Sequence, residues 1–556
     1  MTFDPSSSTE PTGLPSIDYR HLSWAARLVC DYCHDFERLR PFFTGSPLDP
    51  DAWRQAIDTR QANPVNHSQI TAAVMEQLTT REAPDVALAA AEQLSKPGTV
   101  AVVAGQQAGL FGGPLFTVLK GLTAIAVARE VSEKYKVKAV PVFWVHADDH
   151  DLEEISNCSV LTSDFEFETI TIPHDSSSTQ PASAVRLNDS IVSALNRLRE
   201  LLPKTEFTDS VFDELSNAYQ PGRGMVEAFA LWMDTLLGPH GLVVFDASDT
   251  AVKSIARPLF QLELDTAGET SRLATETGSD LIAKGYHAQV TASQHSTGLF
   301  SLSDGRQAIR LTTDERTPDR DFEIGGKVLS SQQMNEQLAK NPAAFSPNVL
   351  LRPIVQDKVF PTIATIAGPS ELAYLGQLRK VYNHFDIPMP IIYPRTSATI
   401  VDQGTLRFME RYDVRFEMLQ AQDDGVLNRL LSNLLPGEID KAIEETKQAM
   451  TDHLATVSAG VTKVDPTLVG AVETTKQRMD RDLKKLGSKI IQAAKRRDET
   501  VQRQFRRARS QSFPNGDPQE RAVSCMYFLN RYGLQAVDHV IKQLPLKIGH
   551  HGLITV

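Results

Sequence analysis

Short apolar runs alternate with amphipathic stretches through the first half of the chain. Residues 99–104 (TVAVVA) and 139–145 (AVPVFWV) are continuous apolar runs, and apolar residues follow helical spacing between about residues 115 and 135. Short valine-rich runs are typical of strands buried on both faces, and a strand, helix and strand in succession form a parallel βαβ unit. Residues 241–248 (GLVVFDAS) predict another strand. The pattern therefore predicts an α/β protein built on a parallel sheet.

The segments between these core elements carry other patterns. Residues 151–240 mix an alternating strand (FEFETITI), a serine-rich loop (DSSSTQPAS) and helical patches, and residues 266–345 contain strand-like runs (YHAQV, GLFSLS, RQAIRLTT) between turns. Residues 348–377 return to apolar strand character. We therefore expect N-terminal helices and the first half of the core in residues 1–150. Insertions are expected at 151–240 and 266–345, and further core segments at 241–265 and 346–405.

Residues 406–556 are expected to form a helical domain. Apolar residues advance in steps of three and four through residues 434–457 and 466–508, close to an 11-residue repeat, which predicts two nearly straight helices. The second could reach on the order of 60 Å. An apolar seam left over on such helices predicts an antiparallel coiled coil that forms a homodimer. The basic run at residues 495–510 is interpreted as a solvated helix face, with a nucleotide or phosphate contact as the alternative.

Composition excludes several classes of protein. The net charge of −12 argues against nucleic acid as a partner. The chain has no apolar run of 18 residues and its N-terminus does not resemble a signal peptide, so we expect no membrane association and a cytoplasmic location. Four cysteines fit a reducing compartment. Cys30, Cys33 and His34 match the c-type haem attachment pattern, but they lie on an amphipathic helix and are interpreted as core-facing thiols.

A glycine-rich loop follows the first predicted strand. Its glycines, Gly105, Gly109, Gly112 and Gly113, match neither the dinucleotide fingerprint nor the Walker pattern. Glycine amides and the start of the next helix near residues 114–115 favour an anionic or strongly polar ligand, and the side-chain amides of Gln106 and Gln107 could add contacts. The alternative is a tight strand-to-helix packing turn. Lys120 lies too far into the helix to imitate a P-loop lysine and is expected nearer the sheet or solvent.

A second polar loop, residues 146–151 (HADDHD), follows the next predicted strand. His146 and His150 could bind a metal. Alternatively, His150 could contact substrate or phosphate while Asp149 and Asp151 fix its tautomer or bind an amine. A solvated loop with a helix-capping aspartate is the third interpretation. Because parallel strands end at one edge of a sheet, this loop and the glycine loop should share a crevice, where open α/β sheets bind ligands.

A third group of polar residues lies in the apolar segment at residues 348–377. Buried polar groups need partners, so their clustering indicates a site, with a structural salt-bridge network as the competing interpretation. The group consists of Asn348, Arg352, Gln356, Asp357, Glu371 and Tyr374.

Several motifs together resemble the bacillithiol-biosynthesis cysteine-adding enzyme family (BshC). They are GQQAGLFGGPLFTVLKG, FWVHADDHDLEEI, GYHAQV, SPNVLLRPIVQD, AGPSELAYLGQL, YPRTSATI, VDPTLVGAVETTK and FPNGDPQER. The resemblance implies a Rossmann-like core similar to class I aminoacyl-tRNA synthetases, inserted connective segments and a dimerising C-terminal coiled coil. It also implies a ligase that joins the carboxyl group of L-cysteine to the amine of glucosaminyl malate. Ser370 and Ala288 depart from the residues that many relatives have, glycine and proline respectively.

A carboxylate and an amine do not condense in water without activation, so this activity implies ATP, with Mg²⁺ as its expected companion. We expect catalytic roles for His150, Asp149 and Asp151. Substrate or nucleotide binding is expected at Gly105, Gln106, Gln107, Gly109, Gly112, Gly113, His287, Asn348, Arg352, Gln356, Glu371 and Tyr374. No metal ligands are predicted; a zinc site stays open, because Cys158 lies near the second loop without ligand spacing around it. The alternative functions are a synthetase-like nucleotide or sugar binding module without ligase activity, and a nucleotidyltransferase.

Overall fold

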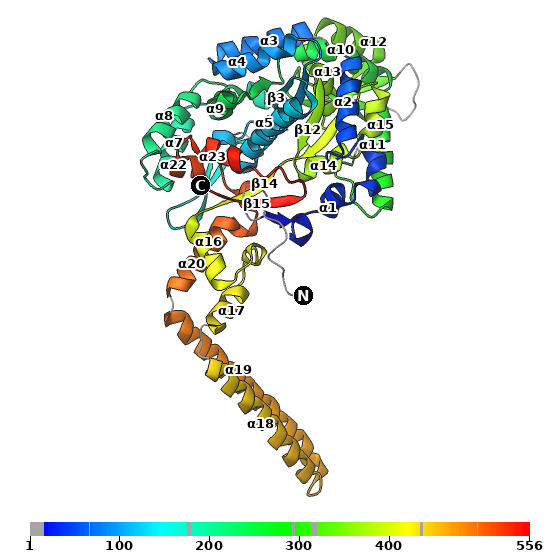
Figure 1. Cartoon of the computed structure of the whole chain (residues 1–556). Coiled ribbons are helices and arrows are strands. Elements are labelled where there is room, and N and C mark those ends of the chain that lie inside the picture. Colours follow the sequence, from blue (N-terminus) through cyan, green and yellow to red (C-terminus); the bar gives the residue numbers. More distant parts are fainter. Residues whose placement is uncertain are drawn as a thin grey trace. The chain divides into compact units, whose positions relative to one another are not determined.

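The computed structural model describes residues 16–65, 67–174, 179–291, 293, 295–312, 320–433, 437–497 and 499–556. The chain divides into two compact units. The first contains Met1–Ile400 and Gln519–Val556, and the second contains Val401–Pro518 (Figure 1). The expected helical domain ran to residue 556, whereas the second unit ends at Pro518. The reason is that β15 (His550–Thr555) pairs with β1 (Ser16–Asp18) and joins β14 (Ser397–Val401) in a small sheet of the first unit.

A five-stranded parallel sheet forms the centre of the first unit. Its order is β13-β12-β2-β3-β6, and every neighbouring pair is parallel. The strands are β2 (Val100–Gln106), β3 (Ala139–Val145), β6 (Val243–Asp246), β12 (Thr362–Ala367) and β13 (Ile391–Pro394). Helix α5 (Leu115–Tyr135) connects β2 to β3. The predicted βαβ unit and the additional strand at residues 241–248 are confirmed.

Both faces of this sheet are buried, which explains why its strands are apolar without interruption. Val100, Val102 and Ala104 of β2 belong to a core shared with α5 and α9 (Met225–Leu237). Ala101 and Val103 belong to a second core, shared with α10 (Thr250–Asp265) and α13 (Arg352–Val359). Alternate residues of a strand point to opposite faces, so one short strand supplies both cores.

The predicted insertions have their own sheets. β4 (Asn157–Leu161) pairs with β5 (Phe167–Thr171). The second insertion holds β7 (Ser296–Ser301), β8 (Gln307–Leu311), β9 (Asp321–Ile324) and β10 (Lys327–Ser330), with β11 (Phe345–Pro347) completing an antiparallel sheet. Residues 175–178 of the predicted serine-rich loop lie outside the described residues.

Two strand predictions are wrong. Residues 286–290 (YHAQV) form no strand, because the side-chain amide of Gln377 takes the place of a neighbouring strand. It accepts a hydrogen bond from the Val290 amide (2.9 Å) and donates one to the Val290 carbonyl (2.9 Å). Residues 352–359 (RPIVQDKV) form helix α13 instead of a strand. Asn348 accepts hydrogen bonds from the amides of Leu350 and Leu351, and Pro353 near the helix start favours this geometry.

Helices surround the sheets of the first unit. On α1, which spans Arg27–His34, Cys33 is buried and Cys30 is half-buried against the same core, as the core-facing interpretation expects. The remaining helices are α1 (Arg27–His34), α2 (Pro50–Ala62), α3 (His67–Thr80), α4 (Asp85–Glu92), α6 (Leu152–Ile155), α7 (Ser190–Leu201), α8 (Thr208–Ala218), α11 (Glu269–Ala283), α12 (Ser331–Lys340), α14 (Pro369–Leu375), α15 (Arg379–His384), α21 (Gln519–Ala522), α22 (Met526–Tyr532) and α23 (Ala536–Gln543).

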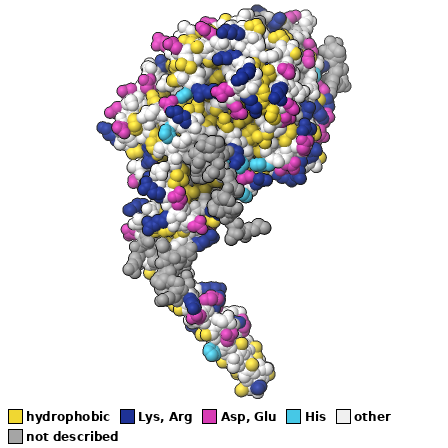
Figure 2. All heavy atoms as spheres, viewed as in Figure 1, with side chains coloured by type: hydrophobic (Ala, Val, Ile, Leu, Met, Phe, Trp, Pro, Cys, Tyr) yellow, Lys and Arg dark blue, Asp and Glu magenta, His cyan; other side chains and the backbone are white. Residues whose placement is uncertain are grey.

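The second unit is helical, as predicted. It consists of α16 (Gln403–Tyr412), α17 (Gly425–Asn433), α18 (Gly437–Val461), α19 (Val469–Arg497) and α20 (Glu499–Ser512). Helices α18 and α19 pack side by side as a hairpin (Figure 1), and 29 residues make α19 about 44 Å long. Figure 2 shows apolar side chains among charged ones on the visible face of this hairpin. In the basic run, Arg507 forms an ion pair with Asp402 (2.5 Å). None of the described helices is long and apolar enough to cross a membrane.

Candidate active site

The two polar loops meet at the carboxyl ends of β2 and β3. Gly105 and Gln106 are in register with Trp144 and Val145, and the His146 amide donates a hydrogen bond to the Gln106 carbonyl (2.9 Å). A Cβ atom on Gly105 would lie 2.5 Å from His146 Nε2. A larger residue at this position would have to displace the imidazole of His146, which directly follows β3. Burial holds the pKa of His146 well below its usual value, and the positive charges of Arg352 and Lys120 lower it further, so this ring is neutral.

The distal half of the glycine loop is packed into the protein. The Gly112 amide donates to the Tyr219 hydroxyl (3.2 Å), and the Gly113 amide donates to the Leu110 carbonyl (3.0 Å). A Cβ on Gly112 would lie 3.0 Å from Trp232. These amides therefore already have acceptors, and the positive φ values of Gly112 (91°) and Gly113 (69°) serve the turn itself. Residues 109–113 therefore have the contacts of a tight strand-to-helix packing turn, which was the alternative interpretation of this loop. Residues 105–107 are the part of the loop that lies at the strand ends.

Lys120 is a central residue of this site, although its sequence position did not identify it. It lies on α5 with a 2% exposed side chain, and Nζ donates to the Gly105 carbonyl (2.7 Å) and to Gln106 Oε1 (2.8 Å). Nζ also pairs with Glu371 Oε2 (2.5 Å), which accepts from the Gly368 amide (2.7 Å) just after β12. Burial lowers the pKa of Lys120, while the Glu371 carboxylate opposes that shift. One ammonium group thus connects the ends of two neighbouring strands.

Asp149 is the main carboxylate on the other side of the crevice. Its Oδ2 lies 3.4 Å from Arg352 Nη1 and 3.4 Å from Gln107 Nε2, and its Oδ1 accepts from the His150 amide (2.8 Å). Burial alone would raise its pKa, but the positive charges of Arg352 and Arg306 hold the pKa of Asp149 below its usual value. Asp149 is therefore ionised at neutral pH. Arg352, predicted as a binding residue, reaches it from the start of α13.

His150 is partly exposed and its Nδ1 accepts a hydrogen bond from Arg306 Nη1 (2.8 Å). Because a guanidinium can only donate, Nδ1 carries no proton, and a neutral His150 has its proton on Nε2. Nε2 is therefore the ring nitrogen that can donate a hydrogen bond to a ligand. Arg306 comes from the turn before β8, stacks over the Phe300 ring (3.7 Å from its centroid) and was not anticipated from the sequence.

A small cavity of about 20 Å³ lies beside these groups, lined among others by Asp148, Lys253, Arg306 and Arg352. Asp148 pairs with Lys253, a buried residue of α10. Its other oxygen, Oδ1, is buried without a hydrogen-bond partner among the described residues. A buried acceptor without a partner is costly, so this oxygen suits a donor supplied by a ligand. The cavity itself has room for about one water molecule.

The remaining predicted site residues lie in different surroundings. Asp151 caps α6 by accepting from the Glu154 amide (3.0 Å), which agrees with the helix-capping interpretation. The side chain of Asn348 accepts hydrogen bonds from two amides of the turn before α13. Gln356 donates to Asp357 (3.1 Å) inside the core. His287 is exposed and its Nε2 pairs with Gln289 (3.1 Å).

Tyr374 is half-buried near Glu371, and burial and that carboxylate raise the pKa of its hydroxyl well above its usual value. Asp357 belongs to a separate buried network in which it accepts from the Tyr382 hydroxyl (2.6 Å). Asp357 and Gln356 thus belong to a buried structural network, the competing interpretation of this polar group. Arg352 and Glu371 are the members that reach the crevice.

Metal ligation by the histidine pair has no support in the described geometry. Within the described ranges, no group of three or more histidine, cysteine, aspartate or glutamate side chains could hold a metal ion. Cys158 is buried, and burial raises the pKa of its thiol to about 12.

The fold and this site define an α/β protein with a Rossmann-like sheet and a polar crevice at its carboxyl edge. The chain belongs to the bacillithiol biosynthesis BshC family. The model of the family's N-terminal Rossmann-like domain matches residues 16–396, and the model of the family's C-terminal coiled-coil domain matches residues 398–556. The chain is 31% identical to a protein of Salinibacter ruber over 95% of this chain and 96% of the relative. It is 32% identical to a protein of Koribacter versatilis (96% and 97%) and 34% identical to one of Chlorobaculum tepidum (82% of each). All three relatives carry the name "Putative cysteine ligase BshC".

Proposed function

We propose that this protein is a ligase that joins the carboxyl group of L-cysteine to the amine of glucosaminyl malate, after ATP-dependent activation, to form bacillithiol. The family membership and the relatives' names support a cysteine ligase. The observation that carries the proposal furthest is the convergence of Lys120, Arg352 and Arg306 on a crevice that also holds Asp149. The carboxylates of both substrates and the phosphates of a nucleotide are anions, and the cations supply their counter-charge.

The proposed reaction has two steps. In the first, a carboxylate oxygen of cysteine attacks the α-phosphorus of ATP, and pyrophosphate leaves with Mg²⁺. In the second, the neutral amine attacks the carbonyl carbon of the mixed anhydride, loses one proton and expels AMP. Both steps develop negative charge on phosphate oxygens, so fixed cations and N–H donors stabilise their transition states.

We assign roles according to the contacts of each group. Arg352 would hold a substrate carboxylate by two-point contact, and His150 Nε2 would donate to a phosphate. Asp149, ionised beside Arg352, would attract the substrate ammonium group. Glu154 would accept its proton: partial burial and the nearby charges of Asp151 and Asp149 raise its pKa, and its carboxylate accepts from Gln107 (2.8 Å). Mg²⁺ would be held mainly by the nucleotide, as is usual for this ion.

Substitution of His150 by alanine tests this assignment. Purified protein is given ATP, cysteine and glucosaminyl malate, and the thiol product is followed by mass spectrometry. We expect turnover to fall about 100-fold because one phosphate donor is lost. The exposed His539 on α23 provides the matched control, and His539→Ala should keep full turnover. Unchanged turnover in His150→Ala would remove His150 from the mechanism.

The alternative functions make different predictions for ATP consumption. A nucleotide or sugar binding module would bind its ligand and consume no ATP, and a nucleotidyltransferase would release pyrophosphate without cysteine. The proposed ligase should release AMP steadily only when cysteine and the amine acceptor are both present.

We also propose that the protein is a cytoplasmic homodimer formed through the α18–α19 hairpin, supported by the large apolar side chains exposed there. These are Val457, Val464, Leu468, Val469, Met479 and Leu486.

A further inference from the structure

A second cavity, of about 220 Å³, lies at the opposite edge of the central sheet, beside the amino-terminal ends of β12 and β13. Its walls come from α2, from the chain around Thr44 and Gly45, and from residues 387–391. β12 begins at Thr362 beside this cavity and ends at Ala367 near the candidate active site. Six residues of strand span roughly 17 Å. The cavity is therefore distinct from the proposed catalytic crevice.

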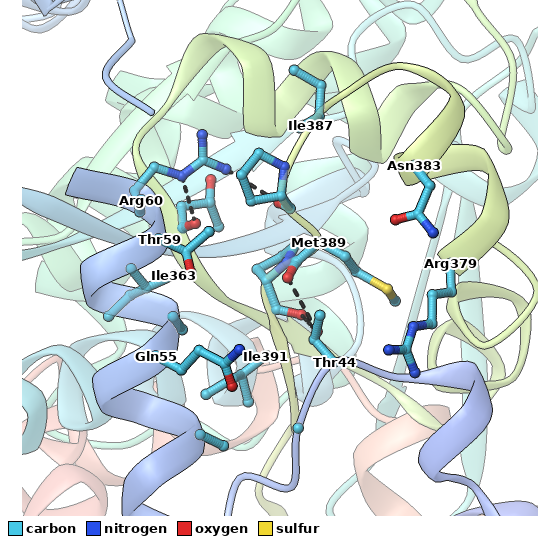
Figure 3. Close-up of a pocket in the computed structure, with 16 residues that line it drawn as sticks. Thr44, Gln55, Thr59, Arg60, Ile363, Arg379, Asn383, Ile387, Met389 and Ile391 are labelled. Atoms are coloured by element: carbon cyan, nitrogen blue, oxygen red, sulfur yellow. Dashed lines mark hydrogen bonds between the residues drawn. The ribbon is translucent and has the colours of Figure 1, made fainter. Parts of the chain in front are cut away.

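Arg60, in the last turn of α2, is the principal charged group of the cavity. Its side chain is buried (4% exposed), Nε donates to the Thr362 carbonyl (3.2 Å), and Nη2 donates to the Pro388 carbonyl (3.3 Å). These bonds hold the guanidinium in place and use two of its five N–H groups. Figure 3 shows Arg60 on one side of the cavity and Arg379 on the other, with Met389 and Thr44 between them.

The charges around the cavity favour an anion. Arg379 is anchored by hydrogen bonds from Nη1 to the carbonyls of Arg40 and Phe43 (both 2.7 Å). None of the described residues that line the cavity is acidic. The buried Asp357 carboxylate, which accepts from Tyr382 and Gln356, acts electrostatically on Arg60 and offsets part of its positive charge. Arg379 adds a second positive charge to the lining, so the cavity keeps an excess of positive charge that an anion would compensate.

The size and remaining lining of the cavity narrow the class of ligand. Ile363, Met389 and Ile391 provide apolar surface, and Gln55 and Asn383 add polar groups near the exterior. A volume of about 220 Å³ fits a small metabolite better than a nucleotide.

A neighbouring cavity of about 520 Å³ shares Arg60. Its lining also contains Lys358 and Asp386, so an acidic side chain partly balances its positive charge. The smaller cavity is therefore the better anion site.

We propose that this cavity binds a small organic anion whose carboxylate or phosphate group is attracted by the positive charges of Arg60 and Arg379, while its carbon skeleton packs against Ile363 and Met389. The site is independent of the proposed ligase activity. It would give the protein a second small-molecule site, on the edge of the sheet opposite to the catalytic crevice.

Charge changes at Gln55 test the proposal without disturbing the buried arginine. Gln55 is exposed on α2 and lines the cavity, so Gln55→Glu, Gln55→Lys and the neutral Gln55→Met should all fold. Malate and inorganic phosphate are titrated into each full-length variant by calorimetry. Every variant carries Arg352→Gln to weaken anion binding in the catalytic crevice, and thermal melting verifies its fold.

We expect at least one of the two probes to bind. Gln55→Glu should weaken that binding about threefold to tenfold, Gln55→Lys should strengthen it by a similar factor, and Gln55→Met should change it less than about twofold. The probe that binds more tightly identifies the preferred anionic group. Equal affinities in the glutamate, lysine and methionine variants, or no binding of either probe up to ~10 mM, would overturn the proposal.

Discussion

Lys120 and Glu371 form an ion pair of 2.5 Å that joins the end of β2 to the turn after β12. The lysine side chain is 2% exposed and the glutamate side chain 21% exposed, so the pair lies at the boundary between the core and the crevice. Both residues also hold backbone groups of their strand ends: Lys120 donates to the Gly105 carbonyl, and Glu371 accepts from the Gly368 amide. The pair therefore positions the two strand ends that form one side of the candidate site.

Substitution of one partner of this pair should damage both stability and activity. Lys120→Met removes the ammonium group that the Gly105 carbonyl and Glu371 share, and we expect it to lower the free energy of unfolding by about 2–4 kcal/mol. Turnover should fall at least about 100-fold if the cation acts on the reacting anions. Urea denaturation and product formation measure the two effects. In the double variant Lys120→Met with Glu371→Gln, the loss of stability should be smaller than the sum of the two single losses. Additive losses would show that the pair does not couple the strand ends.

Arg352 should act mainly on substrate affinity. Arg352→Lys keeps the positive charge but removes the planar fork that two-point carboxylate binding requires, so the KM for glucosaminyl malate should rise about tenfold. The effect on kcat should be smaller. Arg272→Lys is the matched control, because Arg272 is also an arginine paired with carboxylates, but its partners Glu269 and Glu276 lie on its own helix, α11. A KM that is equal in the two variants would exclude Arg352 from substrate binding.

Glu263 should make the stability depend on pH. It is fully buried on α10 and accepts hydrogen bonds from Thr270 (2.5 Å) and the Gly298 amide (2.6 Å). Burial raises its pKa from 4.5 to about 7, so the folded state holds this proton more tightly than the unfolded state. The stabilisation is therefore fully present below about pH 4.5 and is lost as the pH rises through about 7. The loss amounts to about 3 kcal/mol.

Glu263→Gln imitates the protonated carboxyl and should remove this dependence. The amide oxygen can accept from Gly298 while the amide nitrogen donates to the Thr270 hydroxyl. We expect the variant to be more stable than the unmodified protein at pH 8 and similar at pH 5, as measured by urea unfolding. Glu336→Gln on α12 is the control, because Glu336 is exposed, and it should leave the pH profile unchanged. If the free energy of unfolding depends on pH equally in Glu263→Gln and in the unmodified protein, Glu263 is not the group responsible.

The coiled-coil hairpin should carry the dimer contact. Met479 (42% exposed) and Leu486 (49% exposed) lie seven residues apart on one face of α19. Glutamate at both positions should convert the dimer to a monomer in light scattering coupled to size-exclusion chromatography, because charges would be buried in an apolar contact. Ser488→Glu is the control, because Ser488 lies on the opposite face of the same helix. A dimer that survives both glutamates would place the contact elsewhere.

Local sequence patterns were sufficient for the elements whose burial is continuous. The strands at residues 100–106, 139–145 and 243–246 and the helix between the first two follow from apolar runs and helical spacing. The hairpin of α18 and α19 follows from steps of three and four residues. The same patterns failed at residues 286–290, because the hydrogen bonds that a strand would need come from the side chain of Gln377. Residues 352–359 are another case, because they form helix α13 after a turn in which Asn348 accepts from the amides of Leu350 and Leu351.

The sequence by itself determined that two polar loops follow adjacent parallel strands, since strand order and direction follow from the βαβ pattern. Only the tertiary structure decided which side chains converge there. Arg306 reaches His150 from 156 residues away, and Lys120 reaches the end of β2 because α5 packs back along that strand. The Gly112 amide donates to the Tyr219 hydroxyl, a partner that lies 107 residues further along the chain. Burial periodicity is a local property of a chain, whereas the position of a long charged side chain depends on partners that folding brings together.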